Sequence, residues 1–164
     1  MKTLIVLRHA KSSWDHPNLS DFDRPLNKRG ERTAPFMGEL LASEGVEPQI
    51  VVSSPARRAK MTAEAFCGAG GFAAEIEFDE WIYGAGANTL TYVLSEIADK
   101  WDRVMIVGHN PGFEMLVHAL TGKAARMPTA AVAVIDLDIS RWAEIGAGSG
   151  TLRRHYIPRD EMGE

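Results

Sequence analysis

The sequence has little cysteine and no long hydrophobic run. Cys67 is the single cysteine in 164 residues, so the chain cannot form an intramolecular disulfide. With no secretory segment recognisable, a reducing cytoplasm is the expected compartment. A membrane-spanning helix needs about 20 consecutive apolar residues, and a charged residue interrupts every stretch before that length. No membrane association is therefore expected.

Positive charge is also scarce. Lys and Arg number 18 against 22 Asp and Glu, so the formal net charge is -4. Because binding to a nucleic acid backbone needs a basic face, nucleic acid is not an expected partner. No His or Cys pair has the spacing of a zinc finger or an HExxH helix, and Asp21 with Asp23 lacks the further ligands of a calcium loop. No metal or other cofactor is expected.

What is present is the composition of an ordinary globular domain. Hydrophobic residues make up 45% and charged residues 24% of the chain, and its length suits one domain spanning residues 1–164. Residues 3–7 form a continuous run of leucine and β-branched residues, which is typical of a strand buried on both faces of a parallel sheet. A long polar loop follows at 11–25, and loops of this length are often functional.

Strand-like and helix-like segments alternate along the rest of the chain. A helix is expected at 27–43, with a kink or interruption at Pro35. Ser53-Ser54-Pro55 is expected to open a second helix, with serine as the N-cap and Pro55 at the first helical position. Further strands are expected at 49–52, at 74–78 as an edge strand, at 103–107 and at 130–137, and a C-terminal hairpin is expected to pair 142–145 with 151–157. The second helix is expected to end at Cys67, and two more helices are expected near 89–100 and ending at Gly122.

This order predicts a three-layer α/β/α sandwich, with a mostly parallel sheet and an antiparallel C-terminal edge. Ligands of such sheets bind outside the carboxyl ends of the strands. Three strands lead to reactive or basic side chains there: Arg8 and His9 after the first, Arg57 and Arg58 beyond the second, and His109 after the strand at 103–107. Taken singly, each could be an ordinary polar residue at a strand end or helix start.

Together, two imidazoles and at least two guanidiniums beside helix N-termini favour a phosphoryl group as the ligand. Arginine matches phosphate oxygens bidentately, and helix N-termini attract anions. Neighbouring arginines lower the pKa of a histidine by like-charge repulsion. A neutral histidine can attack phosphorus and carry the phosphoryl group covalently, while arginines hold the equatorial oxygens. The pattern therefore predicts phosphoryl-transfer chemistry at this edge of the sheet.

Three motifs, in this order, resemble the histidine phosphatase superfamily, which has the phosphoglycerate mutase-like fold. The motifs are Leu7-Arg8-His9-Ala10, Ser54-Pro55-Ala56-Arg57-Arg58-Ala59 with Thr62-Ala63, and Gly108-His109-Asn110-Pro111. The residues at 8–12, Asp23-Arg24-Pro25-Leu26 and Arg29-Gly30 are similar to its small phosphohistidine phosphatase branch. The resemblance covers nearly the whole chain and implies a metal-independent phosphatase.

The resemblance also implies roles for the residues at the strand ends. His9 would be the phosphorylated nucleophile, and Arg8 and Arg58 would grip the phosphate. His109 would complete the pocket. The arginine of the family pattern lies four residues after the motif serine, which selects Arg58 and leaves Arg57 facing solvent or an outer charge of the substrate.

Four further residues are weaker candidates. Lys11, Ser12 and Arg24 could contact phosphate or substrate, or belong to an ordinary polar loop. Glu80 occupies a place comparable to the carboxylate that many members of the superfamily use as a general acid. The small branch does not clearly depend on such an acid, because solvent or His109 could protonate a departing imidazole.

The expected function is a phosphatase that acts through a phosphohistidine intermediate on His9. Its partner would be a phosphorylated protein, with phosphohistidine as the target, or a small phosphoramidate or phosphomonoester. A phosphoglycerate mutase stays open as an alternative, although the connections at 79–88 and 122–129 are short for the lid that a mutase needs. A non-catalytic phosphate-binding module also stays open, although both histidines and both key arginines are retained. The sequence indicates no oligomeric state.

Overall fold

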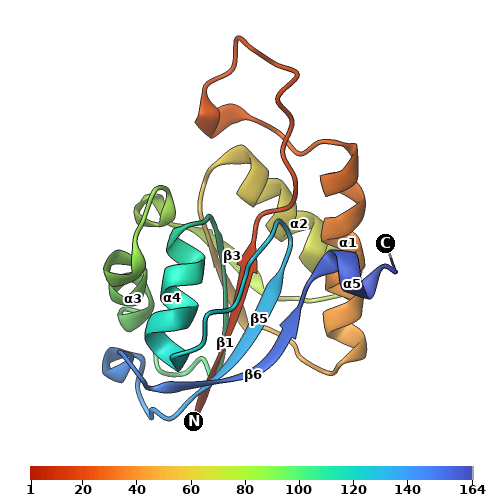
Figure 1. Cartoon of the computed structure of the whole chain (residues 1–164). Coiled ribbons are helices and arrows are strands. Elements are labelled where there is room, and N and C mark those ends of the chain that lie inside the picture. Colours follow the sequence, from red (N-terminus) through yellow and green to blue (C-terminus); the bar gives the residue numbers. More distant parts are fainter. Residues whose placement is uncertain (164) are drawn as a thin grey trace.

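The computed structural model describes residues 1–163 and contains a six-stranded sheet with helices on both faces (Figure 1). The strand order is β3-β2-β4-β1-β5-β6. The strands are β1 (Lys2–Arg8), β2 (Ile50–Ser53), β3 (Glu75–Phe78), β4 (Arg103–Gly108), β5 (Val132–Leu137) and β6 (Gly150–Tyr156). The first four strands are parallel to one another, whereas β5 pairs antiparallel with β1 and β6 pairs antiparallel with β5. The expected antiparallel C-terminal edge is confirmed.

The helices divide between the two faces of the sheet. They are α1 (Lys28–Ser43) and α2 (Arg57–Gly70) on one face, α3 (Ala87–Ser95) and α4 (Gly112–Thr121) on the other, and the short α5 (Pro158–Glu161) near the C-terminus. Single turns of 3-10 helix lie at Asp21–Asp23, Glu80–Ile82 and Trp142–Glu144. No helix within residues 1–163 is long and apolar enough to cross a membrane.

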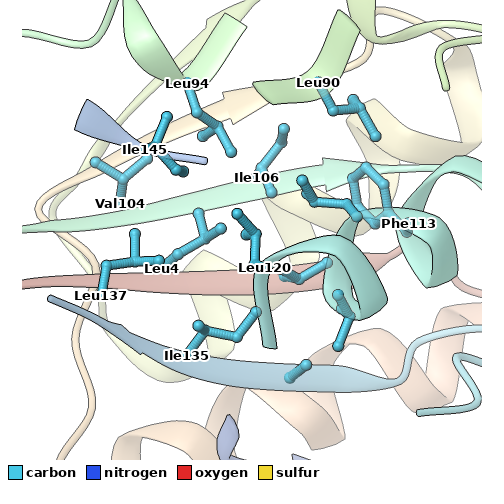
Figure 2. Packing of buried hydrophobic residues seen from close by; sticks show 14 of the residues in the cluster. Leu4, Leu90, Leu94, Val104, Ile106, Phe113, Leu120, Ile135, Leu137 and Ile145 are labelled. Atoms are coloured by element: carbon cyan, nitrogen blue, oxygen red, sulfur yellow. The ribbon is translucent and has the colours of Figure 1, made fainter. Parts of the chain in front are cut away.

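Two hydrophobic cores fill the spaces between the three layers. Successive strand side chains point to opposite faces, so Leu4 packs into the core under α3 and α4, whereas Ile5 packs into the core under α1 and α2. Figure 2 shows the first of these cores, in which Leu90 of α3 and Phe113 of α4 lie near Ile106 of β4. The predicted three-layer sandwich is confirmed.

Helix α1 continues through Pro35, so the expected interruption is wrong. Proline removes one backbone N–H from a helix, but α1 is also packed tightly against α2. A Cβ atom at Gly38 would lie 2.1 Å from the carbonyl oxygen of Phe66, so only glycine permits this approach. Packing between the two helices therefore offsets the local effect of the proline.

Helix α2 begins at Arg57, two residues later than expected, and its N-cap is Ala56. Ser54 does not cap this helix. Its Oγ accepts a hydrogen bond from the backbone N–H of Ala56 (3.2 Å) and lies 2.8 Å from Nε2 of His109. The serine therefore supports the second histidine, a role that the local sequence does not reveal.

The expected C-terminal hairpin is wrong. Residues Trp142–Glu144 form a 3-10 turn, and β6 pairs with β5 instead. Trp142 is fully buried, and its indole N–H donates to the backbone carbonyl of Trp101 (2.7 Å). Alternating hydrophobicity identifies a strand but not its partner, which depends on the whole sheet. Helix α3 also ends at Ser95 rather than near residue 100.

Three neighbouring strands position the candidate site. Because β2, β4 and β1 are adjacent and parallel, their carboxyl ends meet at one edge of the sheet. The long loop that follows β1, drawn in red to orange, projects above this edge at the top of Figure 1. The sheet therefore gathers residues 8–9, 54–58 and 108–109 beneath that loop.

Candidate active site

A pocket of about 310 Å³ lies at this edge. It is lined by Arg8, His9, Lys11, Ser12, Trp14, Arg24, Arg58, His109, Asn110 and Thr129. All the site residues expected from the sequence except Glu80 are in this lining, although they come from widely separated parts of the chain. The parallel sheet brings them together, because each strand ends at the same edge.

His9 is held in one orientation at the end of β1. Only 6% of its surface is exposed, and its backbone N–H donates to the carbonyl of Gly108 (2.9 Å). Its Nδ1 lies 2.7 Å from the carbonyl oxygen of Ala10. A carbonyl can only accept, so Nδ1 carries the ring proton and Nε2 keeps a free lone pair. The orientation suits nucleophilic attack by Nε2.

Burial keeps His9 neutral. Removal from water, with the neighbouring His109, Arg8 and Arg58 acting in the same direction, lowers the pKa of His9 to about 3. The hydrogen bond to Ala10 opposes this shift but does not cancel it. At neutral pH the imidazole therefore has its lone pair available, as nucleophilic catalysis requires.

His109 faces His9 across the pocket, with 5.1 Å between the ring centroids. Burial, followed by the charge of Arg58, lowers the pKa of His109 to about 4. Ser54 Oγ accepts from Ala56 and has one O–H to donate, so we assign the second contact as a hydrogen bond from the Ser54 hydroxyl to His109 Nε2. This assignment places the His109 ring proton on Nδ1, which has no protein partner.

The two key arginines each have an unused donor. Arg8 donates through Nη1 to the carbonyl of Met127 (3.1 Å), and Arg58 donates through Nη1 and Nη2 to Asp21 (2.7 and 3.0 Å). Within residues 1–163, the buried side-chain nitrogen and oxygen atoms without a partner are Arg8 Nε, Arg58 Nε and His109 Nδ1. Buried polar groups are nearly always hydrogen-bonded. All three belong to side chains that line the same pocket, two of them guanidiniums, and this indicates a binding site for an oxyanion.

Asp21 is a site residue that the sequence did not reveal. Its carboxylate accepts from Arg58 Nη2 (3.0 Å), from Arg24 Nε and Nη2 (3.2 and 3.1 Å) and from the phenol of Tyr83 (2.6 Å). The hydrogen bond from Tyr83, with the two arginines, lowers the pKa of Asp21 to about 2. Arg24 is close to Asp21 in sequence, but Arg58 and Tyr83 are distant and meet it only in the folded chain, so no local pattern marks this residue.

Replacement of Asp21 by asparagine is expected to release Tyr83. The hydrogen bond to the carboxylate raises the pKa of Tyr83, because ionisation would place two anions side by side. In Asp21→Asn, the pKa of Tyr83 should fall toward its ordinary value, as followed by phenolate absorbance. Asp23→Asn is the matched control, since Asp23 accepts from Ser20 in the same turn (2.9 Å). An unchanged titration in Asp21→Asn would contradict this prediction.

Two of the weaker candidates from the loop after β1, Ser12 and Arg24, contact each other. Arg24 donates through Nη1 to Ser12 Oγ (2.6 Å) and to the carbonyl of Ser13 (3.2 Å). Its guanidinium carbon lies 3.6 Å from the centroid of the Trp14 ring, in a cation–π arrangement. Arg24 is buried and Lys11 is exposed. The contacts of Arg24 therefore stabilise the loop, whereas Lys11 is an exposed member of the pocket lining.

The structure does not bring Glu80 into the pocket. Glu80 is exposed and lines a separate hollow of about 430 Å³ that also includes Trp81, Tyr83 and Gly84. Arg57 is exposed as expected, whereas the adjacent Arg58 is buried in the pocket wall. Within residues 1–163, no three His, Cys, Asp or Glu side chains converge as metal ligands.

The depressed pKa values predict an acid-sensitive fold. In the unfolded chain histidine takes up a proton near pH 6.5, whereas folded His109 stays neutral down to about 4. The unfolded chain binds more protons in that interval, so the free energy of unfolding should fall as the pH drops through it. The share of His109 should be on the order of 1–3 kcal/mol at pH 4. Urea unfolding from pH 7 to 4 should show a shallower pH dependence in His109→Gln, and an equal dependence would contradict the prediction.

Known proteins are similar to this chain in sequence and in fold. The family model of the histidine phosphatase superfamily (branch 1) matches residues 4–92. An uncharacterized chloroplastic protein of Arabidopsis thaliana is 34% identical over 158 residues, which is 91% of this chain and 72% of that protein. The crystal structure of the "putative phosphohistidine phosphatase SixA" from Agrobacterium tumefaciens has a TM-score of 0.83 at 28% identity, covering 96% of this chain and 98% of that one.

A more local similarity concerns a mutase. The 2,3-bisphosphoglycerate-dependent phosphoglycerate mutase of Streptomyces avermitilis is 43% identical over 63 residues, which is 37% of this chain and 25% of that enzyme. The family match extends over more than half of the chain and includes His9 and Arg58, two of the residues that line the oxyanion pocket. This chain belongs to the histidine phosphatase superfamily.

Proposed function

We propose that this protein is a metal-independent phosphatase that forms a phosphohistidine on His9. The observation that carries the proposal is the group of three unpartnered N–H donors, on Arg8, Arg58 and His109, in the same lining as the free lone pair of His9. During transfer, a phosphoryl group has three equatorial oxygens, and hydrogen-bond donors placed around them stabilise the transition state.

The reaction then proceeds in two displacements. His9 Nε2 attacks phosphorus in line, so that a P–N bond forms while the bond to the leaving group breaks. The leaving group takes the electron pair and is protonated. Water next attacks the phosphohistidine, which releases inorganic phosphate and returns the electron pair to Nε2. Arg8, Arg58 and His109 hold the oxygens in both steps.

The proposed substrate is phosphohistidine, in a protein or as a small phosphoramidate. Two observations support this choice. The structure from Agrobacterium tumefaciens named as a phosphohistidine phosphatase shares nearly the whole fold. Glu80 lies outside the pocket lining, and a phosphoramidate has less need of a strong general acid, because solvent can protonate a departing imidazole.

Phosphoglycerate mutase activity is the second candidate, because of the local sequence similarity to such an enzyme. A mutase must keep water away from its phosphohistidine. The connections from β3 to α3 and from α4 to β5 are short, and short connections supply little material for a lid. Hydrolysis is therefore favoured.

A substrate panel tests the proposed function. Phosphohistidine protein, phosphoramidate, sugar phosphates and 3-phosphoglycerate are each incubated with the protein, with and without a chelator. We expect release of inorganic phosphate that the chelator does not diminish, with the largest kcat/KM for a phosphoramidate bond. Chelator-sensitive release would overturn the metal-independent mechanism. Conversion of 3-phosphoglycerate to 2-phosphoglycerate without phosphate release would establish the mutase instead.

The cytoplasmic location expected from the sequence is also a proposal. Cys67 is buried and unpaired, and burial raises the pKa of its thiol to about 11. The thiol therefore stays protonated and packs as an apolar side chain, as suits a reducing compartment.

A further inference from the structure

Exposed apolar side chains gather beside the pocket. The large hydrophobic residues exposed in residues 1–163 are Met1, Trp14, Leu19, Phe22, Phe78, Trp81, Tyr83, Tyr92 and Met115. Three of them lie in the loop after β1 and two in the turn at Glu80–Ile82 and just beyond it. Trp14 and Trp81 are 78% and 71% exposed. Single exposed apolar residues are common, but a group around one site marks an interaction surface.

Four of these side chains, Trp14, Phe22, Trp81 and Tyr83, form what we call the aromatic rim. Trp14 stacks on Arg24, and both Arg24 and the phenol of Tyr83 bind the carboxylate of Asp21. The ring of Tyr83 lies 5.3 Å from Phe22 and 5.4 Å from His109, centroid to centroid. Trp81 and Tyr83 line the same hollow. The aromatic rim is therefore continuous with the catalytic pocket.

Trp81 is the part of the aromatic rim that lies away from the reaction. His9 is almost fully buried, and Trp81 is not in the pocket lining. A small phosphoryl compound can react in a pocket of about 310 Å³ without reaching Trp81. A protein that inserts a phosphorylated side chain must leave its own backbone outside, over the rim. Tyrosine and tryptophan are enriched at such contacts because they bury a large rigid area.

Charge identifies the occupant further. The pocket floor is cationic, with Arg8 and Arg58, and under the proposed function a phosphoryl group fills it. The surrounding segments are acidic: besides Asp21, whose charge is paired with Arg24 and Arg58, residues 11–24 and 79–84 contain Asp15, Asp23, Asp79 and Glu80 against Lys11. An anionic lipid surface requires a basic face, which this rim does not offer. An acidic rim around a cationic floor is complementary to a phosphorylated residue flanked by basic side chains.

We propose that the aromatic rim docks a protein segment in which the phosphorylated histidine is flanked by lysine or arginine. The inference rests on the proposed function for its phosphoryl chemistry. It adds a protein substrate of stated charge and assigns recognition to residues that take no part in the reaction. The exposed Glu80, expected from the sequence as a proton donor, then contributes to charge recognition.

The test compares two phosphohistidine peptides, one with flanking lysines and one with flanking glutamates, with phosphoramidate as the small substrate. We expect several-fold higher kcat/KM for the lysine peptide, with a difference that shrinks as salt increases. Trp81→Ala should lower kcat/KM for the lysine peptide about tenfold, mainly through KM. The same variant should leave phosphoramidate turnover within about twofold. Tyr92→Ala, at an aromatic 63% exposed on α3, is the matched control and should change neither.

Binding measurements separate this inference from the proposed function. The lysine peptide is titrated calorimetrically into His9→Ala, and into the double variant that also carries Trp81→Ala. Weaker binding in the double variant supports docking even if no substrate is turned over. Equal binding, or an equal loss of peptide and phosphoramidate turnover in Trp81→Ala, would overturn it. Trp81-dependent binding to anionic lipid vesicles, or Trp81-dependent self-association in light scattering, would assign the rim to another occupant.

Discussion

Replacement of His9 by alanine should lower kcat for phosphoramidate by at least about 10⁴-fold, because the two-step reaction loses its nucleophile. Alanine fits the space, and the residue's backbone hydrogen bond to Gly108 is kept. His118→Ala is the matched control, since His118 is an exposed histidine on α4. It should retain full activity. Turnover in His9→Ala within tenfold of the unaltered protein would exclude His9 as the nucleophile.

Detection of the phosphoenzyme intermediate is a second measurement that tests the role of His9. The unaltered protein, quenched during turnover of a labelled substrate, should carry phosphate that is labile in acid and stable in alkali, as expected for a phosphoramidate bond. His9→Ala should carry none, whereas His118→Ala should carry the same amount as the unaltered protein. Label on His9→Ala would place the phosphoenzyme at another residue and contradict the mechanism.

Arg58→Ala should lower kcat/KM by about 10²- to 10³-fold, the usual effect of removing one donor from a developing oxyanion. The adjacent Arg57→Ala should change it by less than about threefold, because Arg57 is exposed while Arg58 is buried in the pocket lining. The two substitutions remove the same group from neighbouring positions of one helix. They therefore separate a specific contact from the general loss of a positive charge.

A conservative variant sharpens this comparison. Arg58→Lys keeps the charge but lacks the Nε donor that has no protein partner, and it cannot reproduce the paired contacts of the guanidinium with Asp21. We expect it to recover less than about tenfold of the activity lost in Arg58→Ala. Tungstate and vanadate should also inhibit Arg58→Ala and Arg58→Lys more weakly than they inhibit the unaltered protein. Equal kcat/KM for Arg57→Ala and Arg58→Ala would contradict the assignment of Arg58.

Most of the fold could be predicted because the buried strands are nearly continuous apolar runs and because helices and strands alternate. The errors share one cause. The interruption at Pro35, the capping role of Ser54 and the pairing of residues 142–145 are local expectations, and packing between distant segments overrides them. Gly38 against Phe66, Ser54 against His109 and Trp142 against Trp101 are the contacts responsible.

The sequence by itself determined where the reactive residues lie: a strand ending in Arg8 and His9, a helix start with Arg58 and a strand ending before His109 are expected to meet at one edge of a parallel sheet. Only the tertiary structure decided which nitrogens stay unpartnered there, that Asp21 holds Arg58, and that Glu80 lies outside the lining. The physical reason is that parallel strands all end at the same edge of a sheet, so a residue that follows such a strand is placed by the backbone alone. Hydrogen bonds and burial depend instead on side chains brought together from distant segments. The chemistry at the strand ends can therefore be predicted from the sequence, but the proposed binding of a protein segment at the aromatic rim depends on the folded surface.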